Sequence, residues 1–349
     1  MTSKQQINKT SPSSPFGVGI IGMGNIAGHH MKALHEIEQG RLVAVCSGSG
    51  RNIPDDRYGV PGYSSVDEML KHPGLDIVII CTPSGFHLEP ALKAAAAGKH
   101  VIVEKPMEVT VERTEEMIAA CQKAGVTLSC IFQNRFSSGY AQLKKAVDDG
   151  LLGKPVLGNA YIKWFRDEAY YNSADWRGTL KGDGGAALIN QSIHTIDLLL
   201  NVMGPVKSVY GKVVTRTHDI EGEDLGVAIL EFENGALGTI EGSTSIHEGF
   251  PEKLEIHGEE GSIILEGGKI SHWNTRSTGK KSFEEKAIPS GSSNPMNIDF
   301  QLHKKQLTAI IDAIREGRIP PVNTEEALLT VRVINAIYKA SVGGCKIEL

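Results

Sequence analysis

The sequence has few cysteines, and their spacing builds no disulfide or zinc framework. Its 349 residues include five cysteines, none of them in a CxxC pair, and an odd number cannot all pair with one another. Three lie within or beside apolar runs, where a free thiol behaves as a small hydrophobic side chain. We therefore expect free thiols, no disulfide framework and no metal site.

Long apolar runs and an excess of basic charge are also absent. The longest apolar runs have the length of a strand, as at residues 77–81, whereas a membrane helix needs ~20 apolar residues. The formal net charge is −5, which gives nucleic-acid binding little support, although backbone N–H groups can still hold a phosphate-bearing small ligand. The first residues have no apolar signal region and are rich in Ser, Pro and Lys. We expect a cytoplasmic protein with a disordered tail over residues 1–14.

The first part of the chain alternates short apolar runs with helical patterns. Strands are expected at 17–21, 42–46, 76–81, 100–103 and 126–132, and helices at 25–38, 65–71, 87–97 and 110–124. Such alternation is typical of βαβ units, whose parallel sheet is buried on both faces. It predicts a doubly wound α/β domain over residues 15–131.

Residues 132–349 follow a different pattern. A helix is expected at 140–150, then closely spaced strand-like runs between 206 and 270, then two helices at about 299–316 and 325–341. The ENG and GEEG segments between the runs suit hairpin turns. This pattern predicts an α+β domain with a large, mostly antiparallel sheet that is open on one face. Because an exposed apolar face is a liability, we expect that face to be buried in a homodimer or homotetramer.

A glycine-rich turn follows the first expected strand and opens the first helix. In VGIIGMGNIAGHH, Gly22 and Gly24 fit the first two positions of the dinucleotide-binding pattern G-x-G-x-x-G/A, and Ala27 fits the third. These positions permit the tight turn, the approach of a pyrophosphate and close packing of helix on strand. Asn25 and Ile26 lie at the helix N-terminus, where N–H groups bind anions. A glycine-rich turn without a ligand is the alternative.

The residue that would select between NAD and NADP is not acidic. A carboxylate for the ribose hydroxyls of NAD is expected about 20 residues beyond the turn, but Ser47 stands there. A carboxylate would repel the 2′-phosphate of NADP, so its absence favours NADP slightly. Arg51 could pair with that phosphate or could be a solvated loop residue. The predicted cofactor is NAD(P), with a lean toward NADP.

Polar residues end two of the expected strands, at the edge where a doubly wound sheet binds its ligands. These residues are Thr82, Pro83, Ser84 and His87 in CTPSGFH, and Glu104, Lys105 and Pro106 in EKP. A proline cannot continue a central strand, so Pro106 fixes where the chain leaves the sheet and directs Lys105 into the crevice. The alternative is a surface lysine paired with Glu104, which could itself be structural or touch the cofactor.

The stretch GDGGAALINQSIHTIDLLLNVMG predicts a glycine loop followed by a helix. Asn190, His194 and Asp197 are spaced to share one helical face, and a polar stripe on an apolar helix needs partners or a wet cleft. We expect a functional His194, although a satisfied core histidine has the same appearance. Asp197 is expected to orient His194 or to support the helix.

Three residues outside these motifs are candidates for substrate binding. Trp176 offers an apolar face for a sugar ring, and Arg177 could hold a carboxylate or phosphate. Arg135 could face the cleft between the domains. Packing and surface ion pairs are the alternative for each of them.

Taken together, these motifs resemble those of the Gfo/Idh/MocA oxidoreductases over nearly the whole chain. The similarity lies in the turn glycines, TPSGFH, AGKHVIVEKP and GGAALINQSIHTIDLLL. It implies a Rossmann domain followed by a substrate domain, and hydride exchange between a nicotinamide and a secondary alcohol of a sugar or polyol. It also implies that Lys105 reaches both nicotinamide and substrate, and that His194 is the acid–base group.

One position departs from that family's usual pattern. Relatives usually carry an aspartate where this chain has Asn190, and an amide cannot accept a proton at neutral pH. Asn190 is therefore expected to orient the substrate or a water. Two other functions stay open, an NAD-dependent glycoside hydrolase and a cofactor-sensing regulator. Retention of Lys105 and His194 disfavours the regulator.

Overall fold

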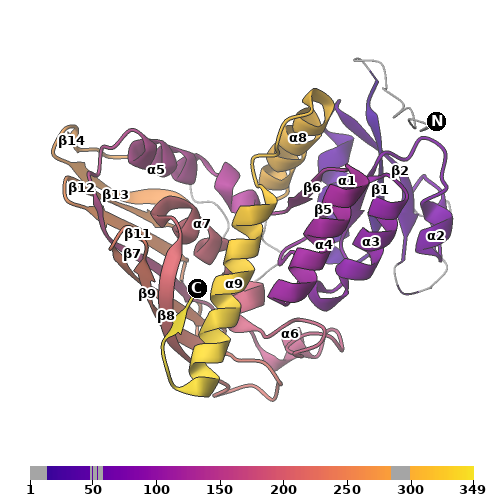
Figure 1. Ribbon diagram of the computed structural model, residues 1–349. Coiled ribbons are helices and arrows are strands. Elements are labelled where there is room, and N and C mark those ends of the chain that lie inside the picture. The colour runs from indigo at the N-terminus through magenta and orange to yellow at the C-terminus, as the bar shows by residue number, and fades with distance from the viewer. Residues whose placement is uncertain (1–13, 48, 50–52, 54–57, 284–298) are drawn as a thin grey trace.

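The computed structural model describes residues 14–47, 49, 53, 58–283 and 299–349, which form two sheets side by side (Figure 1). The expected tail and Arg51 lie outside the described residues, except for Ser14. The first sheet is parallel, with strand order β3-β2-β1-β4-β5-β6. Its strands are β1 (Phe16–Ile21), β2 (Gly40–Cys46), β3 (Gly62–Tyr63), β4 (Ile77–Ile80), β5 (His100–Val103) and β6 (Leu128–Cys130). The predicted doubly wound sheet is confirmed, and its order reverses between β1 and β4, where ligands bind in such folds.

Helices cover both faces of this sheet. Residues alternate in direction along each strand, so Ile20 packs with α1 (Asn25–His35) and α8 (Gln301–Glu316), whereas Ile21 belongs to the core beneath α3 (Leu88–Ala96) and α4 (Val111–Ala124). Met69 of the short helix α2 (Val66–Met69) belongs to the same core as Ile21. By packing, α8 therefore belongs to the first domain, although the expected boundary assigns it to the second.

The second sheet has nine strands in the order β14-β13-β12-β11-β7-β10-β9-β8-β15. They are β7 (Pro155–Lys163), β8 (Val206–Val214), β9 (Leu225–Phe232), β10 (Leu237–Ser243), β11 (Lys253–Gly258), β12 (Gly261–Glu266), β13 (Lys269–Thr275), β14 (Gly279–Lys280) and β15 (Ile347–Glu348). Among the described strands of this second sheet only the β7–β10 pair is parallel, so the mostly antiparallel prediction is confirmed. The central strand β7 was not predicted, because Gly158 and Asn159 interrupt its apolar pattern.

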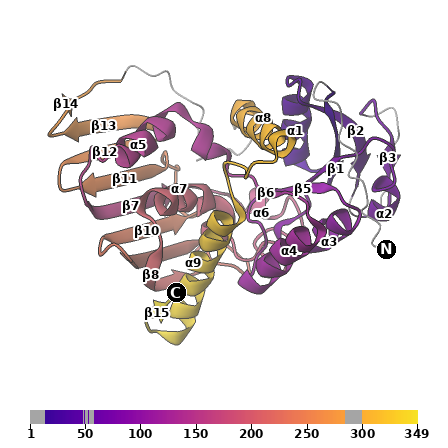
Figure 2. The same ribbon diagram turned by 45° about the horizontal axis from the view of Figure 1, so that its top comes forward.

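One face of the second sheet is covered and the other is open. The helices α5 (Ser138–Asp148), α7 (Ile193–Met203) and α9 (Thr324–Gly343) pack on the same face (Figure 2). On the opposite face, four side chains of β8, β9 and β10 are about half exposed: Tyr210, Val227, Ile229 and Leu237. The predicted open face is thus present, and these four side chains form an apolar patch on it at β8, β9 and β10.

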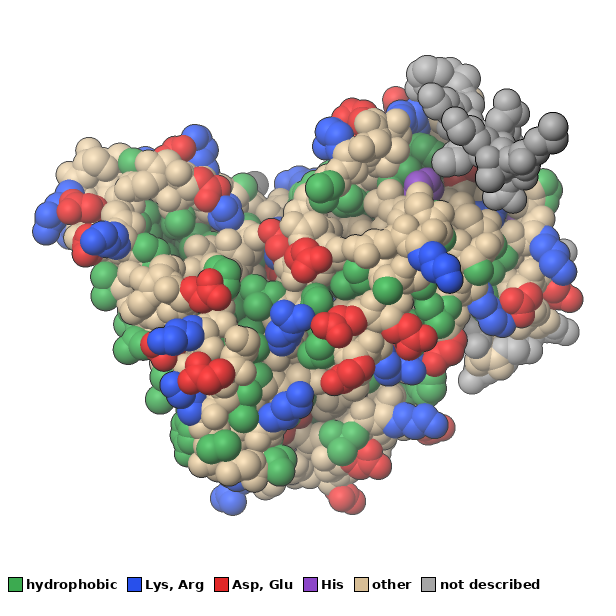
Figure 3. Space-filling model, viewed as in Figure 1, with side chains coloured by type: hydrophobic (Ala, Val, Ile, Leu, Met, Phe, Trp, Pro, Cys, Tyr) green, Lys and Arg blue, Asp and Glu red, His purple; other side chains and the backbone are tan. Residues whose placement is uncertain are grey.

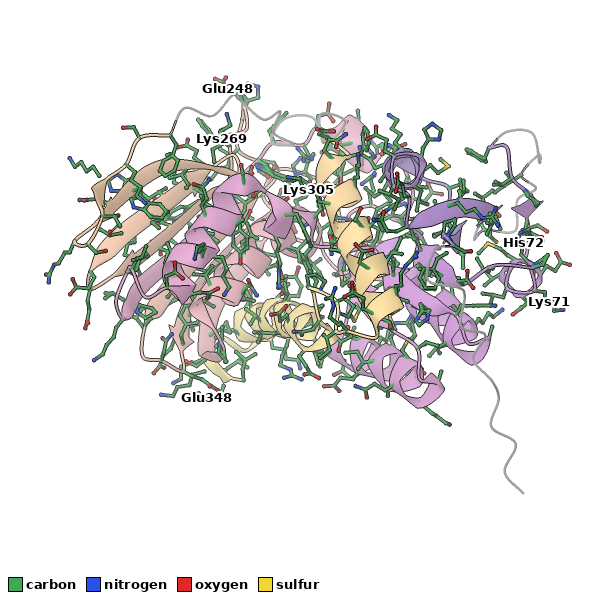
Figure 4. The ribbon with its side chains drawn as sticks, turned by 90° about the horizontal axis from the view of Figure 1, so that it is seen from above. Lys71, His72, Glu248, Lys269, Lys305 and Glu348 are labelled. Atoms are coloured by element: carbon green, nitrogen blue, oxygen red, sulfur yellow. The ribbon has the colours of Figure 1, made fainter. Side chains whose placement is uncertain are left out.

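The outer surface mixes both signs of charge. On the face shown in Figure 3, basic and acidic side chains are interspersed without a basic stripe. None of the helices in the described part of the chain combines the length and the apolar character that a membrane crossing requires. Figure 4 shows Lys71 and His72 at the far end of the first domain, and Lys305 of α8 nearer the second. The Lys305 ammonium donates to the Phe136 carbonyl at 3.5 Å, which joins α8 to the 3₁₀ turn η3 (Gln133–Phe136).

Candidate functional site

A large cavity lies where the carboxyl ends of the first sheet meet the second domain. Its volume is about 1630 Å³, more than the roughly 300–1,000 Å³ of a pocket for one drug-sized ligand. It is lined at one end by the β1–α1 turn and the loops after β2, β4 and β5, and at the other by residues that follow β7 and by the segment before α7. We call these the nucleotide end and the sugar end. The cavity has room for a dinucleotide and a second small molecule.

The β1–α1 turn forms an open cradle at the nucleotide end. Gly22 has a φ of +91°, and a Cβ there would lie 2.6 Å from the backbone that follows β4, so only glycine fits. A Cβ at Gly24 would meet no protein atom within 4 Å. The α1 N-terminus has no side-chain cap, and Asn25 and Ile26 line the cavity. These features fit a pyrophosphate, which needs exposed N–H groups and free space, while Ala27 is fully buried against the sheet.

The loop after β2 supplies a hydroxyl and, among the described residues, no carboxylate. Ser47 lines the cavity, and its buried Oγ has no hydrogen-bond partner in the described part of the chain. An unpartnered buried hydroxyl fits a ligand hydroxyl or phosphate at this point.

The loop after β4 is tied to the loop after β5 by a histidine. Thr82, Pro83, Ser84 and His87 all line the cavity, as predicted. The two ring nitrogens of His87 lie 2.9 Å from the Thr82 carbonyl and 2.9 Å from the Pro106 carbonyl. Both nitrogens are engaged by the backbone, so His87 holds the shape of the cavity wall and has no nitrogen left for a ligand.

The EKP motif places a buried anion beneath Lys105. Its Lys105–Pro106 bond is cis. Glu104 is buried, and its Oε1 lies 2.6 Å from His30 Nε2. Burial alone would raise the pKa of Glu104, but the hydrogen bond from His30 and nearby positive charge lower that pKa to about 2. The alternative of a surface lysine paired with Glu104 is wrong, because the lysine ammonium points to another partner.

That partner is Asn190, which a second carboxylate holds in one orientation. Lys105 Nζ donates to the backbone carbonyl of Asn190 (2.8 Å) and to its side-chain Oδ1 (3.3 Å). Asn190 Nδ2 donates to Asp183 Oδ1. An ionised carboxylate only accepts, so Asp183 fixes the amide with its Oδ1 toward Lys105. Burial raises the pKa of Asp183 to about 6 and lowers the pKa of Lys105.

His194 stands beside this pair at the start of α7. It lines the cavity, packs edge-on against Phe132 at 5.9 Å between ring centroids, and places Nε2 3.4 Å from Gln133 Nε2. Burial and the charge of Lys105 lower the pKa of His194 to about 3. The imidazole is therefore neutral at neutral pH and able to accept a proton, with a pKa well below the ordinary ~6.5.

Two sequence predictions near His194 are corrected. Arg135 donates to both oxygens of Asp197, each at 2.7 Å, and to Glu326 at 2.5 Å. Arg135 thus lies in an ion-pair network and does not line the cavity, contrary to the prediction that it faces the cleft. Asp197 supports that network, which is close to the second of the two roles expected for it, and makes no hydrogen bond to His194 among the described contacts. The prediction assumed one straight helix, but residues 187–192 form a π-helical turn, which shifts Asn190 out of the α7 register.

Only some of the residues at the sugar end were predicted from the sequence. Trp176 and Arg177 line it, as predicted. It is also lined by Gln133, Trp164, Arg166, Tyr170 and Gln191, which were not predicted. Asp183 was overlooked as well, because an aspartate beside glycine is common in turns and GDGG gave no separate signal. The others lie on segments without any strand-end motif.

A cluster behind EKP bears on the expectation of no metal. His30, Glu104 and His303 bring three possible ligand atoms within 4.8 Å of one another. The hydrogen bond between His30 and Glu104 and the edge-on contact of His30 with His303, 5.4 Å between centroids, account for their packing. The expectation of no metal site stays a prediction.

The comparisons with known proteins agree with this architecture. Residues 16–132 match the oxidoreductase family with an NAD-binding Rossmann fold, and residues 140–264 match the GFO/IDH/MocA C-terminal domain. The chain belongs to the Gfo/Idh/MocA oxidoreductase family. It is therefore an oxidoreductase built on an NAD-binding Rossmann domain.

Named members of the Gfo/Idh/MocA family resemble the chain over nearly its whole length. The crystal structure of the WlbA dehydrogenase from Bordetella pertussis, in complex with NADH and UDP-GlcNAcA, is 31% identical with a TM-score of 0.83, covering 96% of this chain and 99% of that one. The scyllo-inositol 2-dehydrogenase (NAD(+)) of Bacillus subtilis (strain 168) is 28% identical over 95% of each chain. The scyllo-inositol 2-dehydrogenase (NADP(+)) of the same strain is 26% identical over 93% of each. The relatives include enzymes named for NAD and for NADP.

Proposed function

We propose that this chain catalyses the reversible oxidation of a secondary alcohol on a sugar, polyol or sugar derivative, with NAD(P) as cofactor. The observation that carries the proposal is the meeting of Lys105 and His194 in the cavity beside the nucleotide cradle. The charge of Lys105 acts on His194 and helps to keep its imidazole neutral. A donor and a base in this arrangement suit an alcohol oxygen that must lose its proton.

The cradle residues would hold the cofactor. Gly22, Gly24, Asn25 and Ile26 would receive the pyrophosphate at the α1 N-terminus, and Ser47 the adenosine ribose or its 2′-phosphate. The loop after β4 would line the nicotinamide half. When bound, the nicotinamide supplies the hydride acceptor. The absence of a carboxylate at Ser47 supports a lean toward NADP.

His194 and Lys105 then divide the work at the alcohol oxygen. His194 is neutral and accepts the hydroxyl proton. Lys105 donates a hydrogen bond to the same oxygen and stabilises the negative charge that develops on it. Asn190 takes no part in the proton transfer. Together with Asp183 it keeps the Lys105 ammonium in place. Asp183 is thus a positioning residue.

The named relatives support a carbohydrate substrate. They include dehydrogenases named for inositols, one named for a D-glucoside and a dehydrogenase in complex with UDP-GlcNAcA. Trp176 at the sugar end offers an aromatic face on which a sugar ring can pack.

The test follows nicotinamide absorbance with NAD+ and then NADP+ over a panel of sugars, inositols, sugar acids and nucleotide sugars. We expect reduction of one cofactor by a member of this panel. Release of a free sugar from a glycoside without net reduction would overturn the proposal in favour of the hydrolase. Absence of both reactions, with the cofactor shown to bind, would count against catalysis on carbohydrates.

We also propose that the open face of the second sheet pairs with a second copy of the chain. Tyr210, Val227, Ile229 and Leu237 form an apolar patch across three adjacent strands, and such patches on stable proteins are usually covered. Ile229→Glu should lower the sedimentation mass of the protein. Ile319→Glu, at a residue that is 77% exposed outside the sheet, is the control. A wild-type monomer would refute the proposal.

A further inference from the structure

A guanidinium at the sugar end is held rigidly, with one edge left for a ligand. Arg177 Nε donates to Ser173 Oγ (3.0 Å), and Nη1 donates to the Tyr170 hydroxyl (2.6 Å). Its central carbon lies 4.3 Å from the Tyr170 ring centroid and 4.7 Å from that of Trp176. In the part of the chain that the structure describes, no side chain accepts from Nη2 and no carboxylate pairs with Arg177. The Nη1–Nη2 edge retains the donor pair that matches a carboxylate or phosphate.

A second guanidinium flanks the same tyrosine. Arg166 is only 3% exposed, and its central carbon lies 5.4 Å from the Tyr170 ring centroid. Its Nε donates to Gln191 Oε1 (3.1 Å) and its Nη1 to the Phe165 carbonyl (2.7 Å). Burial lowers the pKa of Arg166, and the charge of Arg177 adds to this effect. Arg166 and Arg177 thus bring two guanidinium groups to the same tyrosine ring.

Several charges converge on the sugar end. The charge of Arg177 acts on both Arg166 and Lys105, and two buried carboxylates, Glu104 and Asp183, offset the charge of Lys105. Asp175 also lines the cavity but is exposed to solvent, which screens its charge. The carboxylate of Glu221, a further lining residue, accepts from the Leu180 backbone at 2.9 Å. Lys105 is thus offset by buried carboxylates, whereas Arg177 has no carboxylate partner in the described part of the chain.

We propose that the substrate is an acidic sugar, whose carboxylate or phosphate binds the free edge of Arg177. The sugar ring would pack on Trp176 and present its reacting hydroxyl to Lys105 and His194. This inference rests on the proposed function, which it narrows to one class of substrate. It also explains why an arginine, and not a lysine, lies between two aromatic rings. A planar guanidinium can stack on the rings and donate two hydrogen bonds to one carboxylate or phosphate.

Binding without turnover provides the test. Calorimetry on the cofactor-loaded enzyme compares a neutral hexose with the matching hexuronate and hexose phosphate. Wild type should bind at least one acidic sugar about tenfold or more tightly than the neutral one, as a charged hydrogen-bonded pair implies. Arg177→Gln should abolish this preference, and Arg177→Lys should restore part of it. Arg276→Gln is the matched control, because that side chain is 76% exposed and lies outside the cavity.

The outcomes separate this inference from the function on which it rests. A preference for hexuronate identifies a carboxylate, and a preference for the phosphate identifies a phosphoryl group; both support the proposal if Arg177→Gln removes them. Equal binding of neutral and acidic sugars by wild type overturns it, as does a preference that survives Arg177→Gln. Oxidation of a neutral sugar without binding of any acidic one overturns only this inference. Binding that depends on Arg177 without oxidation of any sugar overturns only the proposed reaction.

Discussion

The two ends of the cavity are built on opposite principles. The nucleotide end consists mainly of backbone: a glycine turn, an uncapped helix N-terminus and the loop after β4. The sugar end is a network of side chains from β5, the segment after β7 and the turn before α7. The first end works through free space and exposed N–H groups, and the second through the orientation and charge of a few buried polar groups. A substitution should therefore have a different signature at each end.

The largest effect is expected at Lys105, where the two ends meet. Lys105→Ala removes the donor to the alcohol oxygen and should lower kcat by about 10²–10⁴-fold, the range typical of acid–base groups. Cofactor affinity, measured by nicotinamide fluorescence, should change by no more than about threefold, because the cradle lies elsewhere. His194→Ala should likewise lower kcat and leave the cofactor affinity nearly unchanged. A variant that keeps near-normal turnover would remove that residue from the mechanism.

A smaller effect is expected at Asp183, which touches neither ligand. Asp183→Asn removes the anion that fixes the Asn190 amide and supports the Lys105 charge, which should lower kcat by about 10–100-fold, since loss of a charged buried hydrogen bond costs about 1.5–3 kcal/mol. Asp183 has a raised pKa of about 6. It is anionic only above that value, so wild-type kcat should rise with pH through about 6.

The residual kcat of Asp183→Asn should not fall as the pH drops through about 6, because the remaining base, His194, has a pKa lowered to about 3. The variant should therefore lack the acid limb of the wild-type pH profile. Asp175→Asn, at the exposed carboxylate of the same cavity, serves as control and should keep the limb. An unchanged pH profile in Asp183→Asn would show that Asp183 is merely structural.

The contrast between the two ends also explains what the sequence could predict. The turn glycines, Lys105 and the loop after β4 follow buried strands, and the carboxyl ends of parallel strands meet at one edge. The Arg135–Asp197 and Asn190–Asp183 pairs depend on how separate elements pack. The π-helical turn before His194 has no periodicity that distinguishes it from an α-helix. Strand β7 was overlooked because its small and polar residues lie in the interior of a sheet, where tertiary contacts override local preference.

The two glycines of the turn give the sharpest test of the nucleotide end, although the smallest effect. A Cβ at Gly24 meets no protein atom, so Gly24→Ala should leave the melting temperature nearly unchanged and still weaken cofactor binding by about tenfold, by filling space that belongs to the ligand. Gly22→Ala should behave in the opposite way. Its φ of +91° and the adjacent backbone 2.6 Å away should cost about 1–3 kcal/mol of folding free energy. Equal losses of stability in both variants would mean that the space above Gly24 is needed by the fold and not by the cofactor.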